Sequence, residues 1–126
     1  MTVCRWVVIV VLVVVGVVHV LPLVGVLGDA RLRALYGVTL DDSQVTLLLR
    51  HRAVLFGLLG AFLFYAASQP TLHRVGLAAG SIAVGSFLVL ARDGTNATLT
   101  RVVNVDRALL GVLLVGWVAS AIAARR

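Results

Sequence analysis

The sequence of 126 residues has no lysine and no glutamate, so arginine supplies its basic charge and aspartate its acidic charge. Charged residues make up 13% and aromatic residues 6%, whereas 61% are hydrophobic and the mean hydropathy is +1.10. A soluble domain of this length would need far more polar surface. The composition therefore predicts an integral membrane protein. The preference for arginine is typical of GC-rich genomes and predicts a bacterial source of the actinobacterial type.

Other scarce residues exclude several classes of protein. The single cysteine, Cys4, cannot form an internal disulfide or serve a thiol–quinone enzyme that needs a cysteine pair within this chain. Three histidines on separate segments lack metal-ligand spacing, so we expect no metal and no cofactor. The missing glutamates disfavour small multidrug antiporters and bacterial diacylglycerol kinases. A serine nucleophile is also disfavoured, because no Gly-x-Ser-x-Gly turn occurs.

The net charge of +6 at pH 7 is spread over many short segments. This pattern indicates membrane topology and contact with anionic lipid, and we do not expect nucleic acid as a partner. The opening apolar run is too long for a signal peptide and lacks a convincing cleavage site. We therefore expect it to remain as a spanning helix.

Long apolar runs are the main feature that the sequence does contain. A helix needs about 20 residues to cross the hydrocarbon core, and four segments qualify when two are extended through charged residues. The predicted helices cover about residues 6–27, 45–67, 75–91 and 102–124. They predict one all-α transmembrane domain over residues 1–126, an up-down four-helix bundle. The connector 28–44 should hold a short amphipathic piece at 31–36, and Asp41 with Gln44 resembles a capping box for the second span.

Two charged clusters interrupt the apolar runs, Arg-His-Arg at residues 50–52 and Asn-Val-Asp-Arg at residues 104–107. Inserting one arginine or aspartate at mid-membrane costs about 2.5–3.5 kcal/mol, so such residues usually face a bundle interior or a partner. An up-down bundle places both clusters at similar depth on one side, together with all the acidic residues. The opposite side then holds Arg5, His73, Arg74, Arg125 and Arg126.

Helical spacing suggests which side chains face inward. One stripe on the second span is rich in small residues, which favour close helix contacts, so Arg50 should point inward. The fourth span carries a comparable stripe. The first stripe comprises Arg50, Ala53, Gly57, Gly60 and Phe64, and the second comprises Thr100, Asn104, Arg107 and Gly111.

His19 lies about 12 Å from the cluster side of the first span at 1.5 Å per residue, which is near the membrane midplane. A neutral histidine bonded to another helix is one interpretation, and a role in proton transfer or ligand contact is the other. His51 and His73 should lie at the membrane interface. The candidate ligand-binding residues are therefore Arg50, Arg52, Asn104, Asp106, Arg107 and His19.

These residues leave more than one interpretation of the charged clusters. Arg50 and Arg52 could reach the lipid headgroups while Asp106 pairs with one of them as a structural contact. Alternatively the clusters form a pocket for an anionic headgroup or a polar small molecule, or a protein partner covers them. The terminal side has no acids and ends in two arginines, which predicts termini in the cytoplasm and a multi-pass protein of the bacterial inner membrane.

The chain resembles the small four-helix bacterial membrane proteins grouped with the DoxX-like families. The resemblance rests on Leu-Tyr-Gly at residues 35–37, the Arg-rich start of the second span at 49–53, and the polar start of the fourth span at 104–106. Some relatives carry nucleotidyltransferase labels, but this chain has no His-x-Gly-His motif. The resemblance therefore implies the fold more than an activity.

Two function hypotheses follow from these patterns. The first is a non-enzymatic accessory or structural subunit, which forms either a homodimer or part of a larger membrane complex. The second is a protein that binds a lipid or hydrophobic ligand, or an enzyme acting on an amphiphile. In that case Asp106 is the best candidate acid or base, with Arg50 and Arg107 as an anion clamp. A transporter ranks third, because four spans without repeats rarely transport alone.

Overall fold

The computed structural model describes residues 3–125, and within them every regular element is helical. Helix α1 (Val3–Val20) continues into the 3₁₀ helix η1 (Leu21–Leu27), and the short helix α2 (Asp29–Tyr36) follows. Helix α3 (Ser43–Ser68) leads through η2 (Pro70–Leu72) into α4 (His73–Leu90). The 3₁₀ turn η3 (Ala91–Asp93) precedes α5 (Ala97–Ala124). The predicted all-α class is confirmed for these residues.

Four helical segments are long and apolar enough to cross a membrane: Val3–Leu27, Ser43–Ser68, Pro70–Asp93 and Ala97–Ala124. They correspond to the four helices predicted from the sequence, with ends that differ by a few residues. The amphipathic piece expected in the long connector is helix α2. Arg126, which was expected on the terminal side, lies outside the described residues.

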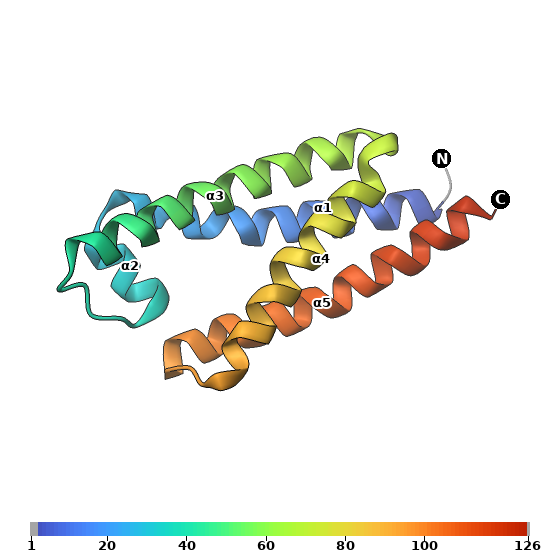
Figure 1. The fold of residues 1–126 in the computed structure, drawn as a ribbon. Coiled ribbons are helices and arrows are strands. Elements are labelled where there is room, and N and C mark those ends of the chain that lie inside the picture. The colour runs from blue at the N-terminus through green and yellow to red at the C-terminus, as the bar shows by residue number, and fades with distance from the viewer. Residues whose placement is uncertain (1–2, 126) are drawn as a thin grey trace.

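The long helices run back and forth, so that the start of α1 and the end of α5 lie near the α3–α4 turn (Figure 1). Helix α2 and the α4–α5 turn lie at the other end. Helix α1 packs against α3 and α5, and α4 packs against α5 and α3. Because α2 also contacts η1 and α5, it closes one end of the space between these helices.

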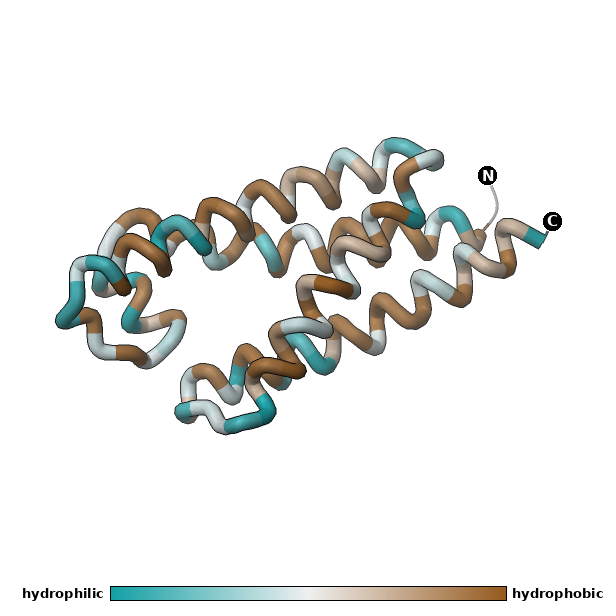
Figure 2. Tube along the Cα trace, in the orientation of Figure 1, coloured by the Kyte–Doolittle hydropathy of each residue, from teal (hydrophilic) through white to brown (hydrophobic). Residues whose placement is uncertain are grey.

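The core is a layer of aliphatic side chains from the four long helices. Leu12, Leu63, Leu77 and Leu113 are fully buried in it. A second, smaller cluster under α2 contains Leu32, Tyr36 and Leu40. Figure 2 shows hydrophobic residues along most of each long helix and hydrophilic ones gathered mainly near the ends.

Two glycines allow α1 and α3 to approach closely. A Cβ atom added at Gly60 would lie 2.8 Å from the Gly16 carbonyl oxygen and 2.5 Å from a methyl group of Val20. Ala53 on the same face of α3 is fully buried. The predicted helix contact on the second span is therefore confirmed at Ala53 and Gly60.

One local prediction was wrong. The cap of α3 is Asp42, whose carboxylate accepts a hydrogen bond from the Gln44 backbone N–H at 2.7 Å, and not Asp41. Helix α3 begins at Ser43, so only the residue before it can reach the free N–H groups of the first turn. His73 is buried within the protein, with its Nε2 atom 3.2 Å from the Ala67 carbonyl oxygen in the α3–α4 turn. Its position at the membrane interface stays a prediction.

Candidate functional site

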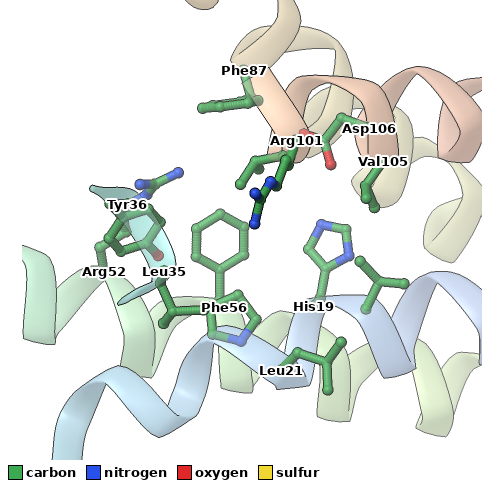
Figure 3. A pocket seen from close by; sticks show the side chains of 13 residues that line it. His19, Leu21, Leu35, Tyr36, Arg52, Phe56, Phe87, Arg101, Val105 and Asp106 are labelled. Carbon is green, nitrogen blue, oxygen red and sulfur yellow. The ribbon is translucent and has the colours of Figure 1, made fainter. Parts of the chain in front are cut away.

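A cavity of about 210 Å³ lies at the α2 end of the helices, where side chains from α1, η1, α2, α3, α4 and α5 meet (Figure 3). Polar side chains from four of these helices reach it, and its other lining residues are apolar. The polar members are His19, Tyr36, Arg52, Arg101 and Asp106. The apolar members are Val18, Leu21, Pro22, Leu35, Phe56, Phe87, Val102 and Val105.

The guanidinium of Arg52 is surrounded by aromatic rings. Its central carbon lies 4.9 Å from the centroid of Phe56, 5.1 Å from that of Tyr36 and 5.7 Å from that of Phe87. Aromatic faces attract a cation through their negative quadrupole, more strongly when water is excluded. The rings therefore hold the Arg52 charge beside the cavity, and no carboxylate of the described residues lies within ion-pair distance of it.

Tyr36 is brought to the cavity by contacts between distant parts of the chain. Helix α2 ends at Gly37, whose φ of 62° is the left-handed conformation that ends helices and favours glycine. The Asn96 side-chain amide donates hydrogen bonds to the carbonyl oxygens of Tyr36 at 3.0 Å and Gly37 at 3.1 Å. Its oxygen accepts from the Leu99 N–H at 2.8 Å, which caps α5. Asn96 thus joins the end of α2 to the start of α5.

The Tyr36 hydroxyl is buried and has no hydrogen-bond partner among the described residues. Only 5% of the Tyr36 surface is exposed. Burial raises the pKa of the phenol above its ordinary value, and the Arg52 charge partly offsets this change. The hydroxyl therefore keeps its proton at neutral pH, so it is a hydrogen-bond donor that lacks an acceptor. A buried group of this kind usually costs free energy unless water or a ligand completes it.

His19 is buried, and its Nδ1 atom lies 2.8 Å from the Val15 carbonyl oxygen in the same helix. The expected bond to another helix is therefore not what the structure contains. The ring instead packs on Phe56 of α3, with 5.6 Å between centroids. A carbonyl oxygen only accepts, so Nδ1 carries a proton. In the neutral ring Nε2 is then an acceptor.

We expect NMR spectra of protein with ¹⁵N-labelled histidine to show His19 as the Nδ1–H tautomer near neutral pH. The reason is the bond to the Val15 carbonyl, which holds the proton on Nδ1. His51 is exposed and serves as an internal reference, because it should show the tautomer mixture of a solvated ring. A predominant Nε2–H signal from His19 would contradict this geometry.

Asp106 and Arg101 enter the cavity from α5, and Figure 3 shows both pointing towards the side where Phe56 and His19 lie. Within residues 3–125 the ion pairs are Arg50–Asp29 at 3.2 Å and Arg92–Asp93 at 4.0 Å. The expected pairing of Asp106 with Arg50 or Arg52 is therefore absent. The carboxylate and two guanidiniums share the cavity without direct contact, which leaves each free to bind a ligand.

Three of the predicted site residues do not line this cavity. Arg50 is exposed and donates a hydrogen bond to the Asp29 carboxylate at 3.2 Å, so it does not point inward. Asn104 and Arg107 are also exposed. Each residue of a helix is turned by about 100° from the one before it. Arg52 therefore faces the cavity although Arg50, two residues earlier, does not.

The stripe proposed for the fourth span lies on the outer face of α5. Its inner face is formed by Val103, Leu109, Leu113 and Gly116, which are buried. This face includes Asp106, which is partly buried, but not its neighbour Arg107. The stripe prediction was wrong because it placed polar residues inside when apolar side chains already form that contact.

Sequence reasoning missed Tyr36, Phe56, Phe87 and Arg101 as members of the site. One sequence feature could have found Phe56, since it lies four residues after Arg52 and therefore on the same face of the helix. No comparable feature marks Tyr36 or Phe87, because both reach Arg52 only through the tertiary fold.

Comparison with protein-family models, with curated proteins and with solved structures finds no match to this chain. The resemblance to DoxX-like families therefore stays a prediction.

Proposed function

We propose that this protein is a small polytopic protein of the bacterial inner membrane that binds a hydrophobic or amphiphilic ligand in the cavity beside Arg52. Its four long helical segments cross the membrane as an up-down bundle with both termini in the cytoplasm. Membrane insertion is supported by their length and by large apolar side chains on their outer faces, such as Ile82 (70% exposed) and Leu90 (78% exposed).

The observation that carries the proposal is the mixed lining of the cavity. Small-molecule sites usually combine apolar walls with a few convergent polar groups. Here the apolar walls meet two guanidiniums, a carboxylate, a neutral imidazole and an unpartnered phenol. A purely structural cluster would be expected to pair its partly buried charges, Arg52 and Asp106, because unpaired charge held away from water is costly. Asp106 is also the candidate acid or base if the ligand is transformed, since it faces the same space.

Blocking the cavity should remove the ligand. We expect native mass spectrometry of protein released from a mild nonionic detergent to show a bound molecule that is lost in Val105→Phe, because the larger ring fills space at a lining position. The matched control is Val75→Phe, an exposed position on α4 outside the cavity lining, which should retain the molecule. Equal retention in both variants, or no bound molecule in the unmodified protein, would contradict the proposed function.

A second candidate function is the accessory or structural subunit. It is favoured by a separate apolar groove of about 380 Å³ between α1 and α5. Side chains such as Val7, Leu114 and Val118 line this groove, and they would suit a neighbouring helix. The same mass spectra discriminate, because a subunit would retain a protein partner and would do so in Val105→Phe as well.

A further inference from the structure

The charges around the cavity restrict the chemical class of ligand. Arg52 and Arg101 bring two positive charges and Asp106 brings one negative charge, with His19 neutral when its proton is on Nδ1 alone. The lining therefore carries one excess positive charge. Arg52 and Asp106 are partly buried and Arg101 is exposed. A ligand with one negative charge would neutralise the excess positive charge beside the apolar lining.

The Tyr36 hydroxyl indicates where the negative group binds. It is a buried donor without an acceptor, and it belongs to a residue of α2 that lines the cavity. An oxyanion supplies the missing acceptor. Arg101 has five N–H donors, and none of them makes a hydrogen bond or ion pair with another described residue. A phenol and a guanidinium together form a charge-assisted donor set for a carboxylate or phosphate.

Asp106 does not occupy the same depth as this donor set. It follows Arg101 by five residues of α5, which corresponds to about 7.5 Å along the helix axis at 1.5 Å per residue. The Asp106 carboxylate therefore starts from a deeper backbone position on α5 than the Arg101 guanidinium. Arg101 and Tyr36 lie close to the helix ends, where lipid headgroups are found, whereas Val105 and Val18 line the cavity deeper along α5 and α1.

The size of the cavity indicates how much of the ligand it encloses. Its volume of about 210 Å³ is below the roughly 300–1,000 Å³ of sites that bury a whole drug-sized molecule. A headgroup and the first part of a chain fit within it. The rest of an apolar tail would lie along the exposed apolar faces of the helices.

We propose that the site binds an amphiphile with a single oxyanion headgroup, a carboxylate or a phosphate, held by Arg101 and the Tyr36 hydroxyl, with its apolar tail on the deeper side. This inference rests on the proposed function. Arg52 contributes its fixed charge from within the aromatic cage, which is the set of rings formed by Tyr36, Phe56 and Phe87. The site would discriminate against a neutral amphiphile with the same tail, because the lining would then keep its one excess positive charge.

The test compares three probes at equal concentration: oleate, oleyl alcohol and sodium acetate, at a pH where oleate is ionised. Native mass spectrometry measures the fraction of protein that carries each probe. We expect oleate to bind about tenfold more tightly than oleyl alcohol, since hydrogen bonds to a charged group are among the stronger ones. Acetate should not be retained, because it has the headgroup but no tail. Retention of acetate at the level of oleate would overturn the amphiphile assignment in favour of a free anion.

Substitutions identify the residues that recognise the headgroup. In Arg101→Gln we expect the preference for oleate to fall to about twofold or less, and in Tyr36→Phe to fall several-fold. The matched control is Arg107→Gln, which removes the same charge from an exposed position of α5 outside the cavity and should keep the full preference. Tyr36→Phe should leave the stability of the unliganded protein unchanged or raised, because its hydroxyl has no partner there.

The outcomes separate this inference from the proposed function. Equal binding of oleate and oleyl alcohol, both blocked by Val105→Phe, overturns the oxyanion assignment and leaves the ligand-binding function standing. Equal loss of preference in Arg101→Gln and Arg107→Gln also overturns it, because the effect is then one of total charge. If neither oleate nor oleyl alcohol binds, the oxyanion assignment is overturned as well. If the unmodified protein then still carries a native molecule that Val105→Phe loses, the ligand-binding function stands and only the ligand class was wrong.

Discussion

Replacing Gly60 with leucine is expected to prevent stable folding. A Cβ atom at this position meets the Gly16 carbonyl oxygen at 2.8 Å and the Val20 backbone nitrogen at 3.2 Å, and backbone atoms cannot turn aside as a side chain can. Overpacking a core costs about 1–3 kcal/mol and sometimes more. Because leucine would force α1 and α3 apart along their whole contact, we expect a loss of at least about 3 kcal/mol.

The matched control for Gly60→Leu is Gly111→Leu. Gly111 is also within a long helix, but a Cβ atom added there meets nothing within 4 Å. Its substitution should change the free energy of unfolding by about 0.5 kcal/mol or less. Unfolding in detergent mixtures with increasing sodium dodecyl sulfate, followed by circular dichroism, measures both variants. Similar stability of the two would mean that α1 and α3 do not pack through Gly60.

Removing the guanidinium of Arg52 is expected to cost more than removing that of Arg50. Each cation–π contact is worth about 0.5–2 kcal/mol depending on how much water is excluded, and Arg52 lies within 6 Å of three aromatic rings. We expect Arg52→Ala to lower the free energy of unfolding by about 2–3 kcal/mol. The loss also includes packing, because the rings then border an empty space.

Two further variants separate charge from packing at Arg52. The free energy of unfolding of Arg52→Lys should lie between those of the original protein and Arg52→Ala, since an ammonium keeps the charge but cannot stack as a planar group. Arg50→Ala removes an exposed ion pair with Asp29 and should cost about 1 kcal/mol or less. The same detergent unfolding measures all three. If Arg50→Ala proved as costly as Arg52→Ala, the aromatic cage would not be the source of the stability.

The helices of this protein could be predicted because the length of each apolar run indicates the length of the helix. Runs of about 20 apolar residues have few alternatives to a long helix. The short helix α2 was also predictable, since Leu32 and Tyr36 are spaced by four residues among arginines. The exact cap residues were harder to predict. Asp41 and Asp42 are equivalent by composition, and the chain geometry at Ser43 selects the second of them.

The rotation of the helices could not be predicted with the same success. In a soluble protein the polar side of a helix faces water, so the opposite side can be recognised as the buried one. Here both sides are apolar, and the hydrophobic periodicity is weak. This explains why Asn104 and Arg107 were placed inside although apolar residues fill that face of α5. It also explains why Arg50 was expected to point inward, because nothing in the triplet itself shows which arginine meets the rings of α2 and α4.

Part of the candidate site could be predicted on free-energy grounds alone. His19, Arg52 and Asp106 interrupt apolar segments, where polar groups are costly, and all three line the cavity. The aromatic wall could not be predicted, because Tyr36 and Phe87 belong to segments that meet α3 only in the folded chain. Arg101 was missed because it stands near the start of α5, where an arginine needs no special explanation.

The double role of Asn96 has a consequence for how a molecule could exchange with the cavity. Its amide holds the last turn of α2 and its oxygen holds the first turn of α5. Swinging α2 outward breaks both amide bonds together, which adds about 2 kcal/mol to the cost of that movement. The rate of ligand entry from this side is then governed in part by a loop residue that does not line the cavity. Affinity and exchange rate can therefore vary independently of one another in this protein.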